Sequence, residues 1–577
     1  MSGMLTSVEQ KNILELLGSK DSLFLIPDYQ RPYAWGDDEC SALWDDIVDF
    51  AVTGNSFNIN NEYFLGPIVT FRNESKKLEV IDGQQRLITI LLMLRAFYQD
   101  MDNFSDSWSR EIRKNIGRCI WETDEEGRPD RDKLKIDSQV VTDDERNELA
   151  EILRSGNADN MKSRYAANYR LLQGFIRSRS DRHDKSSTDF QHDYSKLPNR
   201  ILNNCILLPI QANTQDAALR IFSTLNDRGK PLSDSDIFKV KLYKAFSDDG
   251  RKDYFTDRWK ELETLCGRIF SPLKISCPMD ELFNRYMHYE RAKAGITDST
   301  QEGLRSFYER GNYRLLREEH ERVFANLQAL AGFWRAVADQ DEGIFSEQVL
   351  RRLFVLDYAP NAAWTLITSV YFMSNKDAEG RLDDAKFYDF LGKITAFIWT
   401  ATILGANSHN LRTPLFREMV EILGGHGVTF GKYRFDAEEL KAEIQRCKFN
   451  GKKKITRSML AWWLMADKEQ PLLLLSASLE TEHIAKKGKI NPDMYEMLGN
   501  KSLLEGKIKS SAANLDFTDK KRYYIGIPSL RKAGTQIHEL HCIAGAKGNF
   551  NAKDISQRSK KIIEGFLQFV AYNGLTK

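Results

Sequence analysis

The chain has 577 residues and a mass of 66.5 kDa, too much for one hydrophobic core, and this length predicts about three to five structural units. Its 42% hydrophobic and 29% charged residues, with 32 Phe, 21 Tyr and 10 Trp, exclude a mainly disordered chain, because so many rings favour burial. No apolar run approaches the roughly 20 residues of a membrane span, and the first residues lack the pattern of a signal peptide. We therefore expect a protein without a membrane partner.

The cysteines and the distribution of charge give predictions about the cellular compartment and the binding partner. The seven cysteines form no CxxC pair and no zinc-ligand spacing, which predicts reduced thiols in a cytoplasmic protein. The net charge is +1, but residues 482–577 carry 17 Lys+Arg and 9 Asp+Glu, a local net charge of +8. A basic C-terminal unit on an acidic body favours a phosphate backbone as partner. On charge alone, a lysine-rich solvated surface is an equally good interpretation.

Three regions follow one another along the chain. In residues 1–245, short β-branched runs predict strands at 24–26, 66–71, 78–81 and 205–210. The charged stretch 124–144 and the polar stretch 177–196 are predicted to be loops or insertions. From about 250 to 445 the pattern is helical, with Val323, Leu327 and Leu330 on one face and a buried helix at 387–403. The Gly-Lys-Lys-Lys stretch at 451–454 predicts a boundary before the basic unit.

The motif Asp82-Gly83-Gln84-Gln85-Arg86 stands between an apolar strand and an apolar helix. Asp82 is predicted to cap the helix and Gly83 to turn the backbone. The free N–H groups of the helix start, together with Arg86, would attract a phosphate, and the two glutamines offer partners for a base, a sugar or a water. The alternative is a capped helix whose polar residues face solvent and bind no ligand. The five residues between the apolar strand and the apolar helix disfavour this alternative.

Two further clusters accompany this motif. Residues 26–35 are aromatic and basic and contain Tyr29, Gln30 and Arg31, which could stack on a base or anchor the loop on the core. Residues 218–232 predict a helix that ends at an Asn-Asp-Arg-Gly turn, after which Ser233 or Asp234 caps the next helix. For the second cluster, a helical corner without a ligand is an equally good interpretation.

Four of these elements occur in an order that resembles a known family. Pro-x-Tyr-Gln-Arg at 27–31, Phe-Leu-Gly at 64–66, Asp-Gly-Gln-Gln-Arg at 82–86 and Phe-x-x-Leu-Asn-x-x-Gly-x-x-Leu at 222–232 resemble the N-terminal domain of GmrSD-type restriction endonucleases. That domain is similar to the ParB/sulfiredoxin group, whose members bind or hydrolyse nucleotides. The resemblance implies an α+β nucleotide-binding, NTPase domain at 1–245. Its pocket would be lined by Tyr29, Gln30, Arg31, Asp82, Gly83, Gln84, Gln85 and Arg86, with Asn226 and Gly229 close to it.

The C-terminal region has a second, weaker signature. A predicted strand at 479–484 ends in His483, and a Gly-Asn turn at Asn500 precedes a basic helical segment. A lone histidine near a strand end is more often structural, but this order is similar to the C-terminal domain of the same family. That domain is an HNH-like, or His-Me finger, nuclease of the ββα-metal type, placed here at 451–577. The resemblance implies His483 as general base and Asn500 as a contact to Mg²⁺ or Mn²⁺.

The nuclease signature departs from the family pattern at two places. Lys486-Lys487 stands where Pro-Gln is usual, and Lys509 stands where the third polar residue is usually Asn. An ammonium has only donors and cannot coordinate a cation, so Lys509 would contact the phosphate while Asn500, Asn514 and water hold the metal. The alternative is that Lys509 points outward as one more basic surface residue.

The sequence therefore predicts a mixed α and β, multidomain protein with a helical connector at 246–450. The resemblance implies a nucleoside triphosphate-hydrolysing endonuclease that acts on modified double-stranded phage DNA in bacterial defence. A homo-oligomer is a further expectation. The alternative is a nucleotide-regulated DNA-binding sensor whose nuclease domain is degenerate and needs a partner. Metal-dependent nicking of DNA by the pure chain would distinguish the two.

Overall fold

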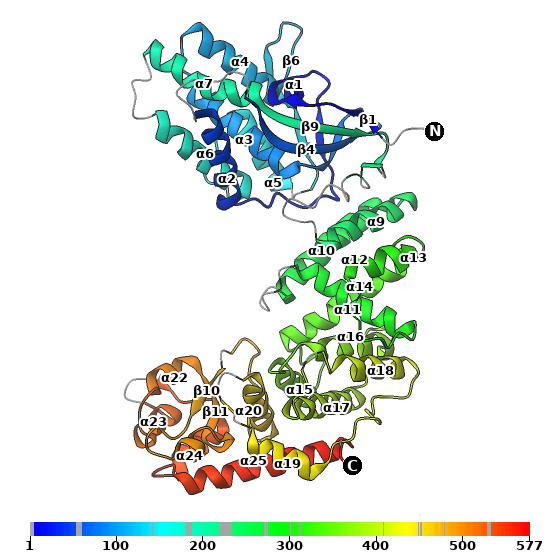
Figure 1. Cartoon of the computed structure of the whole chain (residues 1–577), viewed down its shortest axis with the longest axis vertical. Helices are drawn as coiled ribbons and strands as arrows, with labels where there is room; N and C mark the ends of the chain where they lie inside the picture. Colours follow the sequence, from blue (N-terminus) through cyan, green and yellow to red (C-terminus); the bar gives the residue numbers. More distant parts are fainter. Residues whose placement is uncertain are drawn as a thin grey trace. The chain divides into compact units, whose positions relative to one another are not determined.

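The computed structural model describes residues 5–52, 61–140, 143–180, 187–215, 217–218, 221, 233–270, 275, 277–300, 302–311, 313–407, 409–447, 449–450, 453–477, 479–527 and 532–577. The chain separates into two compact units, Met1–Lys244 and Ala245–Lys577 (Figure 1). Both contain helices and sheets, which confirms the predicted mixed α and β, multidomain class. In the described ranges, no helix is long and apolar enough to cross a membrane.

The central sheet of unit 1 has the strand order β1-β9-β4-β5-β3-β8, with β2 also paired to β9. Strand β4 runs parallel to β9 and antiparallel to β5, whereas β3 runs parallel to both β5 and β8. Parallel strands end at the same edge of a sheet, so the segments that follow β3 and β5 are brought together there. The bounds are β1 Leu5–Val8, β2 Lys11–Asn12, β3 Phe24–Ile26, β4 Tyr63–Arg72, β5 Leu78–Asp82, β8 Ile136–Ser138 and β9 Cys205–Ala212, with a separate hairpin of β6 Trp121–Thr123 and β7 Pro129–Leu134.

Helix α3 (Gln84–Asp100) lies at the centre of unit 1 and is buried along nearly its whole length. It packs against α4 and α6 and contributes a continuous run of apolar side chains to the core. A helix that is apolar all round is expected to be surrounded by other elements. The other helices are α1 Ile13–Leu17, α2 Asp37–Val52, α4 Ser107–Ile120, α5 Asp143–Ser155, α6 Arg164–Ser180, α7 Thr188–Asn204 and α9 Asp234–Asp248, which crosses the unit boundary.

Two segments predicted to be loops contain regular structure instead. Residues 124–144 include β7 and β8, and β8 joins the central sheet with Ile136 paired to Phe24. The segment 177–196 includes the end of α6 and much of α7, where Phe190, Tyr194 and Leu197 recur at helical spacing and pack on the core. The charged and polar residues between these few apolar positions concealed both patterns in the sequence.

Unit 2 begins as a stack of helices. The predicted face of Val323, Leu327 and Leu330 is buried on α14, and the predicted helix at 387–403 is α17, which confirms both expectations. Ser233, which the sequence named as a possible cap, accepts a hydrogen bond from the Asp236 N–H before α9. The helices of this part are α10 Lys252–Phe270, α11 Pro278–Lys293, α12 Leu304–Ser306, the π-helix Phe307–Gly311, α13 Tyr313–Arg317, α14 His320–Asp339, α15 Glu347–Asp357, α16 Ala363–Asn375, α17 Asp384–Ile403, α18 Arg412–Leu423 and α19 Ala437–Arg446.

The last part of unit 2 contains an antiparallel pair, β10 and β11, followed directly by helix α22. This strand–strand–helix order agrees with the expected ββα arrangement. Strand β10 ends at His483, which pairs with Lys501 at the start of β11. The elements are α20 Lys454–Ala466, β10 Leu479–His483, α21 Pro492–Tyr495, the 3-10 helix Leu498–Asn500, β11 Lys501–Glu505, α22 Gly506–Ala512, α23 Phe517–Ile525, β12 Gly526–Ile527, β13 Lys532–Ala533, α24 His538–Ala546 and α25 Ala552–Tyr572.

The helical part and the basic part share one core. Trp462 of α20 packs on Phe566 and Phe569 of α25, with ring centroids 5.1 and 5.5 Å apart, and Arg352 of α15 lies 4.7 Å over the ring of Phe569. Helix α25 also packs against α17 and α19 (Figure 1). The division of residues 246–577 at position 450 thus does not separate two compact units, and its assignment to a connector and a nuclease domain stays a prediction.

Candidate functional site

The junction between β5 and α3 turns sharply at Gly83. This residue is the N-cap of α3 and adopts a left-handed conformation, φ +89°. A Cβ there would lie 2.9 Å from Cγ1 of Ile68 and 3.1 Å from the carbonyl oxygen of Pro67, so only glycine fits. The prediction that Asp82 caps the helix is wrong by one residue, because its Oδ1 accepts a hydrogen bond from the Gly83 N–H at 2.8 Å. Since no side chain caps α3, its first N–H groups remain candidates for an anion.

The two glutamines of the motif hold a loop. Nε2 of Gln84 donates to the carbonyl oxygen of Arg31 at 3.0 Å. Oε1 of Gln85 accepts from the N–H groups of Ala34 and Trp35 at 2.6 and 3.2 Å, and its Nε2 donates to the carbonyl oxygen of Pro32 at 3.3 Å. Both side chains are buried, 5% and 7% exposed. Nε2 of Gln84 and both polar atoms of Gln85 fix the backbone of residues 31–35, and direct contact of the two glutamines with a nucleotide stays a prediction.

Arg86 lies over the Phe-Leu-Gly motif. Its Nη1 donates to the carbonyl oxygen of Pro67 at 3.0 Å, and its guanidinium lies 3.1 Å from the position of a Cβ on Gly66, whose φ is +115°. Gly66 thus provides the space that the guanidinium occupies. The Arg86 side chain is half-buried, and its contact with a phosphate stays a prediction. The two motifs at 64–66 and 82–86 are therefore parts of one structural feature.

The loop after β3 brings the remaining predicted residues to the same edge. Tyr29 is 3% exposed, donates to Oε2 of Glu79 at 3.2 Å and packs against Tyr243 with ring centroids 5.0 Å apart. Nε2 of Gln30 donates to the carbonyl oxygen of Ile81 at 3.1 Å. These contacts favour the anchor interpretation of the aromatic cluster for Tyr29 and Gln30.

Arg31 is the exception in this loop. Across the described residues its guanidinium has no hydrogen bond and no ion pair, and it lines a cavity of about 300 Å³ together with Pro32, Tyr33, Ala34, Glu145, Arg164 and Tyr165. The rings of Tyr33 and Tyr165 are stacked with centroids 5.0 Å apart, and Nη1 of Arg164 donates to the carbonyl oxygen of Ala34 at 2.5 Å. This volume is at the lower end of the range for ligand pockets.

The electrostatics of the junction depend on one carboxylate and two cations. Burial raises the pKa of Asp82, while the Gly83 N–H and the charges of Arg86 and Arg31 act in the opposite direction. Burial lowers the pKa of Arg86, and Asp82 opposes that shift. Asp82 is therefore the carboxylate whose charge both guanidinium groups favour.

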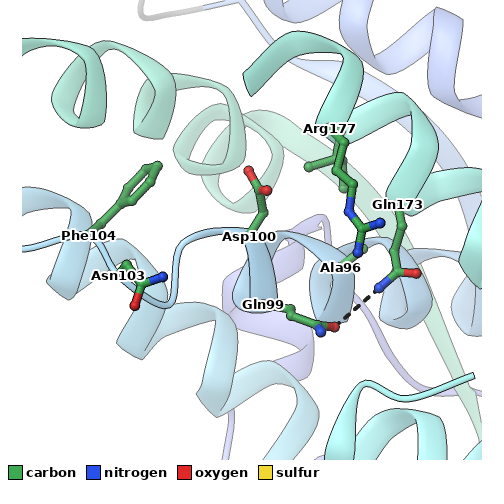
Figure 2. Close-up of a pocket in the computed structure, with 8 residues that line it drawn as sticks. Ala96, Gln99, Asp100, Asn103, Phe104, Gln173 and Arg177 are labelled. Atoms are coloured by element: carbon green, nitrogen blue, oxygen red, sulfur yellow. Dashed lines mark hydrogen bonds between the residues drawn. The ribbon is translucent and has the colours of Figure 1, made fainter. Parts of the chain in front are cut away.

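A second cavity of about 220 Å³ lies at the other end of α3 (Figure 2). Oε1 of Gln99 accepts hydrogen bonds from Nε2 of Gln173 at 3.2 Å and from the hydroxyl of Tyr169 at 2.8 Å. Asp100 accepts from the hydroxyl of Tyr194 at 2.8 Å. At a rise of roughly 1.5 Å per residue, the length of α3 separates this cavity from Gly83 by about 25 Å. It is not part of the predicted site.

In unit 2, His483 lies at the end of β10 against Tyr495. The two rings are parallel, 5° apart, with centroids separated by 4.0 Å. Nε2 of His483 is buried and has no hydrogen-bond partner in the described part of the chain. Burial, together with the charge of Lys501, lowers the pKa of His483 to about 4, so the imidazole is neutral at pH 7 and able to accept a proton.

Asn500 positions the backbone beside His483. It is fully buried; its Oδ1 accepts from the Ala485 N–H at 2.8 Å, and its Nδ2 donates to the carbonyl oxygens of Tyr495 and Ala485 at 3.1 and 3.4 Å. The amide thus links the segment after β10 to the segment before β11. A side chain enclosed in this way does not present its oxygen to a cation.

The other predicted metal-site residues do not complete a ligand set. Nζ of Lys509 lies 2.7 Å from Oε2 of Glu480, and Asn514 is exposed with φ +62° in the turn after α22. Among the described His, Cys, Asp and Glu side chains, the one group close enough to hold a metal ion is Asp249, His320 and Glu321, which lies outside this hairpin. Asn500, Lys509 and Asn514 as arranged do not fit a Mg²⁺ or Mn²⁺ site, since such cations need several free oxygen ligands.

A buried ion pair supports the hairpin. Nζ of Lys520 lies 2.5 Å from Oε1 of Glu482, both side chains are 5% exposed, and the same ammonium donates to the carbonyl oxygen of His483 at 2.7 Å. The hydroxyl of Tyr524 donates to Glu482 at 3.3 Å. Lys501, with a fully buried side chain, pairs with Glu496 at 2.7 Å. Part of the basic charge counted in this region is therefore neutralised inside the fold.

Sequence reasoning missed Arg164 and the pair of Glu482 and Lys520. Arg164 is the first residue of α6, where a cation is unfavourable beside the positive end of the helix dipole, and that anomaly was the available signal. For the buried pair the sequence offers no signal, because the two residues are 38 positions apart. Asn226, Gly229 and the motif at 222–232 lie outside the described residues.

The comparison with known families agrees with the geometry of unit 1. Residues 13–243 match the model of the GmrSD restriction endonuclease N-terminal domain. A search among curated proteins gives no match. The matched range contains both the β5–α3 junction and the loop that Gln84 and Gln85 hold. Residues 13–243, less than half of the chain, are therefore similar to the N-terminal domain of GmrSD restriction endonucleases.

Proposed function

We propose that the chain is a nucleotide-binding DNA endonuclease that cleaves modified foreign DNA, such as phage DNA, in bacterial antiviral defence. The observation that carries the proposal is the guanidinium of Arg31, which has no hydrogen bond or ion pair among the described residues and lines a cavity, in the range that matches the N-terminal domain of restriction endonucleases. Similarity of residues 13–243 to the N-terminal domain of that family supports a DNA-cleaving enzyme. The nucleotide, its hydrolysis and the modified DNA are the proposed additions.

Arg31 and Arg86 are the proposed phosphate contacts of the nucleotide. Guanidinium groups form charge-assisted, bidentate hydrogen bonds with phosphate, and the N–H groups at the start of α3 add a favourable dipole. The stacked pair of Tyr33 and Tyr165 forms an aromatic wall of the same cavity. Gln84 and Gln85 act indirectly, because they fix the backbone from which Arg31 extends.

DNA cleavage is proposed to occur at the β10–β11 hairpin of unit 2. The neutral imidazole of His483 can accept a proton from the attacking water, and Lys509 can stabilise negative charge on the phosphate once it leaves Glu480. Lys487, Lys507 and Arg522 are exposed and have no carboxylate partner in the part of the chain described here. These three cations are the proposed contacts to the DNA backbone.

The decisive experiment is digestion of modified and unmodified phage DNA by the purified chain. Each nucleoside triphosphate is tested in turn, with Mg²⁺, with Mn²⁺ and without added cation. We expect cleavage of modified DNA that responds to one of the nucleotides. His483→Ala should eliminate cleavage, and Lys509→Ala should reduce it without eliminating it. The control is His426→Ala, because His426 is an exposed histidine of the same unit.

One observation favours a second candidate function. Because Asn500, Lys509 and Asn514 do not assemble a cation site, we infer as the alternative a nucleotide-regulated DNA-binding sensor whose nuclease domain needs a partner. In that case wild type and His483→Ala show the same residual nicking under all conditions. DNA binding should persist, and its dependence on nucleotide then identifies the sensor.

The DNA contact has its own test. Binding of the whole chain to DNA should weaken steeply with salt, because each phosphate contact releases counterions. Replacing Lys487, Lys507 and Arg522 together by Ala should reduce the slope of log K against log salt by about 2–3. The matched control replaces the exposed Lys432 and Lys468 of the same unit. An unchanged slope in the triple variant would show that these three residues do not contact the DNA backbone.

A further inference from the structure

A cavity of about 190 Å³ lies within the helical part of unit 2, where the sequence shows no motif. It is bounded by α11, the start of α16 and α18, which pack against one another. Helix α11 contributes a polar face at helical spacing, and α18 contributes one cation followed by an apolar face. The lining residues used below are Glu281, Asn284, His288, Arg412, Leu415 and Phe416.

His288 is the first sign that this cavity takes a ligand. Its side chain is 2% exposed, and its Nε2 has no hydrogen-bond partner in the described residues. The ring lies against Phe416, with centroids 5.1 Å apart. Burial, with the charges of Arg291 and Arg412, lowers the pKa of His288 to about 3, so the imidazole is neutral. A buried polar nitrogen without a partner is rare in native proteins, because leaving it unpaired is costly.

Arg412 is the second sign. It is the first residue of α18, at the positive end of the helix dipole, where a cation is unfavourable. The described residues give its guanidinium no hydrogen bond and no carboxylate partner. The one carboxylate of the lining, Glu281, is already held by Nε of Arg285 at 2.7 Å. The cavity therefore carries an unbalanced positive charge.

The remaining lining defines the shape and polarity of a ligand. Asn284 adds a carboxamide that has no hydrogen-bond partner in the described part of unit 2, while Leu415 and Phe416 belong to an apolar wall. A cavity of about 150 Å³ is enough for benzene, and drug-sized pockets begin near 300 Å³. The available volume thus fits one ring with a small substituent and is too small for a whole nucleotide.

We propose that this cavity is a binding site for a small aromatic anion, a single ring that carries a carboxylate or a similar acceptor group. The ring packs on the apolar wall that includes Leu415 and Phe416. The anionic group accepts hydrogen bonds from Arg412, Asn284 and the Nε2–H of His288. The site is independent of the nucleotide and DNA sites proposed above, and its test does not depend on cleavage activity.

The test is calorimetric titration of the full chain with benzoate, and with benzamide as the neutral ring of the same shape. We expect benzoate to bind with a dissociation constant below about 1 mM and benzamide to bind at least tenfold more weakly. Arg412→Gln should weaken benzoate binding by about tenfold to a hundredfold, because it removes charge-assisted hydrogen bonds. Arg417→Gln, on the exposed side of α18, should leave it unchanged.

A second variant separates loss of the site from loss of the fold. His288→Phe keeps an aromatic ring in the core and removes the nitrogen; it should weaken benzoate binding while benzamide binding changes little. Thermal melting of each variant, with and without 10-fold excess benzoate over the dissociation constant, checks that the fold persists. Benzoate that binds no tighter than benzamide, binding that Arg412→Gln does not change, or no binding at all would each overturn the proposal.

Discussion

In the β5–α3 junction of unit 1 and in the β10–β11 hairpin of unit 2, side-chain amides link two backbone segments. The two places differ in whether their cations have carboxylate partners. At the junction, Gln85 joins α3 to residues 32–35; at the hairpin, Asn500 joins the two strand ends. Arg31 then has no partner among the described residues and lines a cavity. In contrast, Lys501, Lys509 and Lys520 at the hairpin each have a carboxylate partner.

Within these motifs, the difference distinguishes side chains that hold the backbone in place from charged side chains that can bind a ligand. In both motifs the amides of Gln85 and Asn500 each make three hydrogen bonds to backbone groups, so they fix geometry. The charged groups determine what the site can bind, since an unpaired guanidinium attracts a phosphate and a paired ammonium must first be released. If the proposed ligands bind, the junction needs no change in these charge pairs, whereas at the hairpin Lys509 must first leave Glu480.

The largest effect is expected from the buried pair beside His483. Lys520→Met leaves Glu482 buried without its ammonium, and removal of one member of a buried ion pair destabilises a protein by roughly 3–5 kcal/mol. We expect the free energy of unfolding of unit 2 to fall by that amount in urea titrations. Lys521→Met, at the neighbouring position on α23, is the control, since its Nζ donates to the carbonyl oxygen of Lys547 at the surface. Equal stability of both variants would show that the pair is not required.

The second prediction compares the loss of unfolding free energy when each of the two glutamines of the junction is replaced. Gln85→Ala removes three hydrogen bonds to the loop, and Gln84→Ala removes one. At about 1 kcal/mol per hydrogen bond, unfolding free energies should fall by roughly 2–3 and 1 kcal/mol. Nucleotide affinity should decrease in the same order, because the loop that carries Arg31 loses its position. A reversed order would favour direct contact of Gln84 with the ligand.

A third effect should appear in binding alone. Arg31→Ala removes a side chain with no partner in the described residues, so stability should remain within about 0.5 kcal/mol. Nucleotide affinity should fall by about tenfold to a hundredfold, as for loss of one charge-assisted phosphate contact. Arg86→Ala should lower both affinity and stability, because Arg86 also bonds to Pro67. The exposed Arg72→Ala serves as the control in the same equilibrium dialysis.

Much of the fold was accessible from the sequence, and the reasons are local. The strands at 24–26 and 78–81 are short β-branched runs, and α14 and α17 have regular apolar spacing. Strand β8 was missed because three residues in a charged stretch carry little pattern, and its identity comes from pairing with β3. Helix α7 was missed because polar residues separate its few apolar positions.

The candidate sites were accessible only in part. The motif at 82–86 identified the correct edge of the sheet, but hydrogen-bond partners such as Ala34 for Gln85 lie 51 positions away and leave no trace in the local sequence. The same holds for Asn500, whose partner Ala485 is 15 residues distant. A motif therefore located the site, whereas the division between ligand contacts and scaffold depended on long-range contacts.

The last effect is the pH dependence that His483 contributes. Its pKa is about 4 in the folded chain and about 6.5 when unfolded, so between these values the unfolded chain binds more protons. The free energy of unfolding should therefore decrease as the pH falls from about 6.5 to about 4, with no contribution to the slope outside that window. His483→Gln should flatten this part of the profile, whereas His426→Gln should not.

DNA cleavage that needs the neutral imidazole should likewise persist below pH 6 and decline only near pH 4. Urea midpoints at pH 7, 5.5 and 4.5 measure the first effect, and an identical slope in wild type and His483→Gln would show that His483 is not shielded from protons in the folded chain.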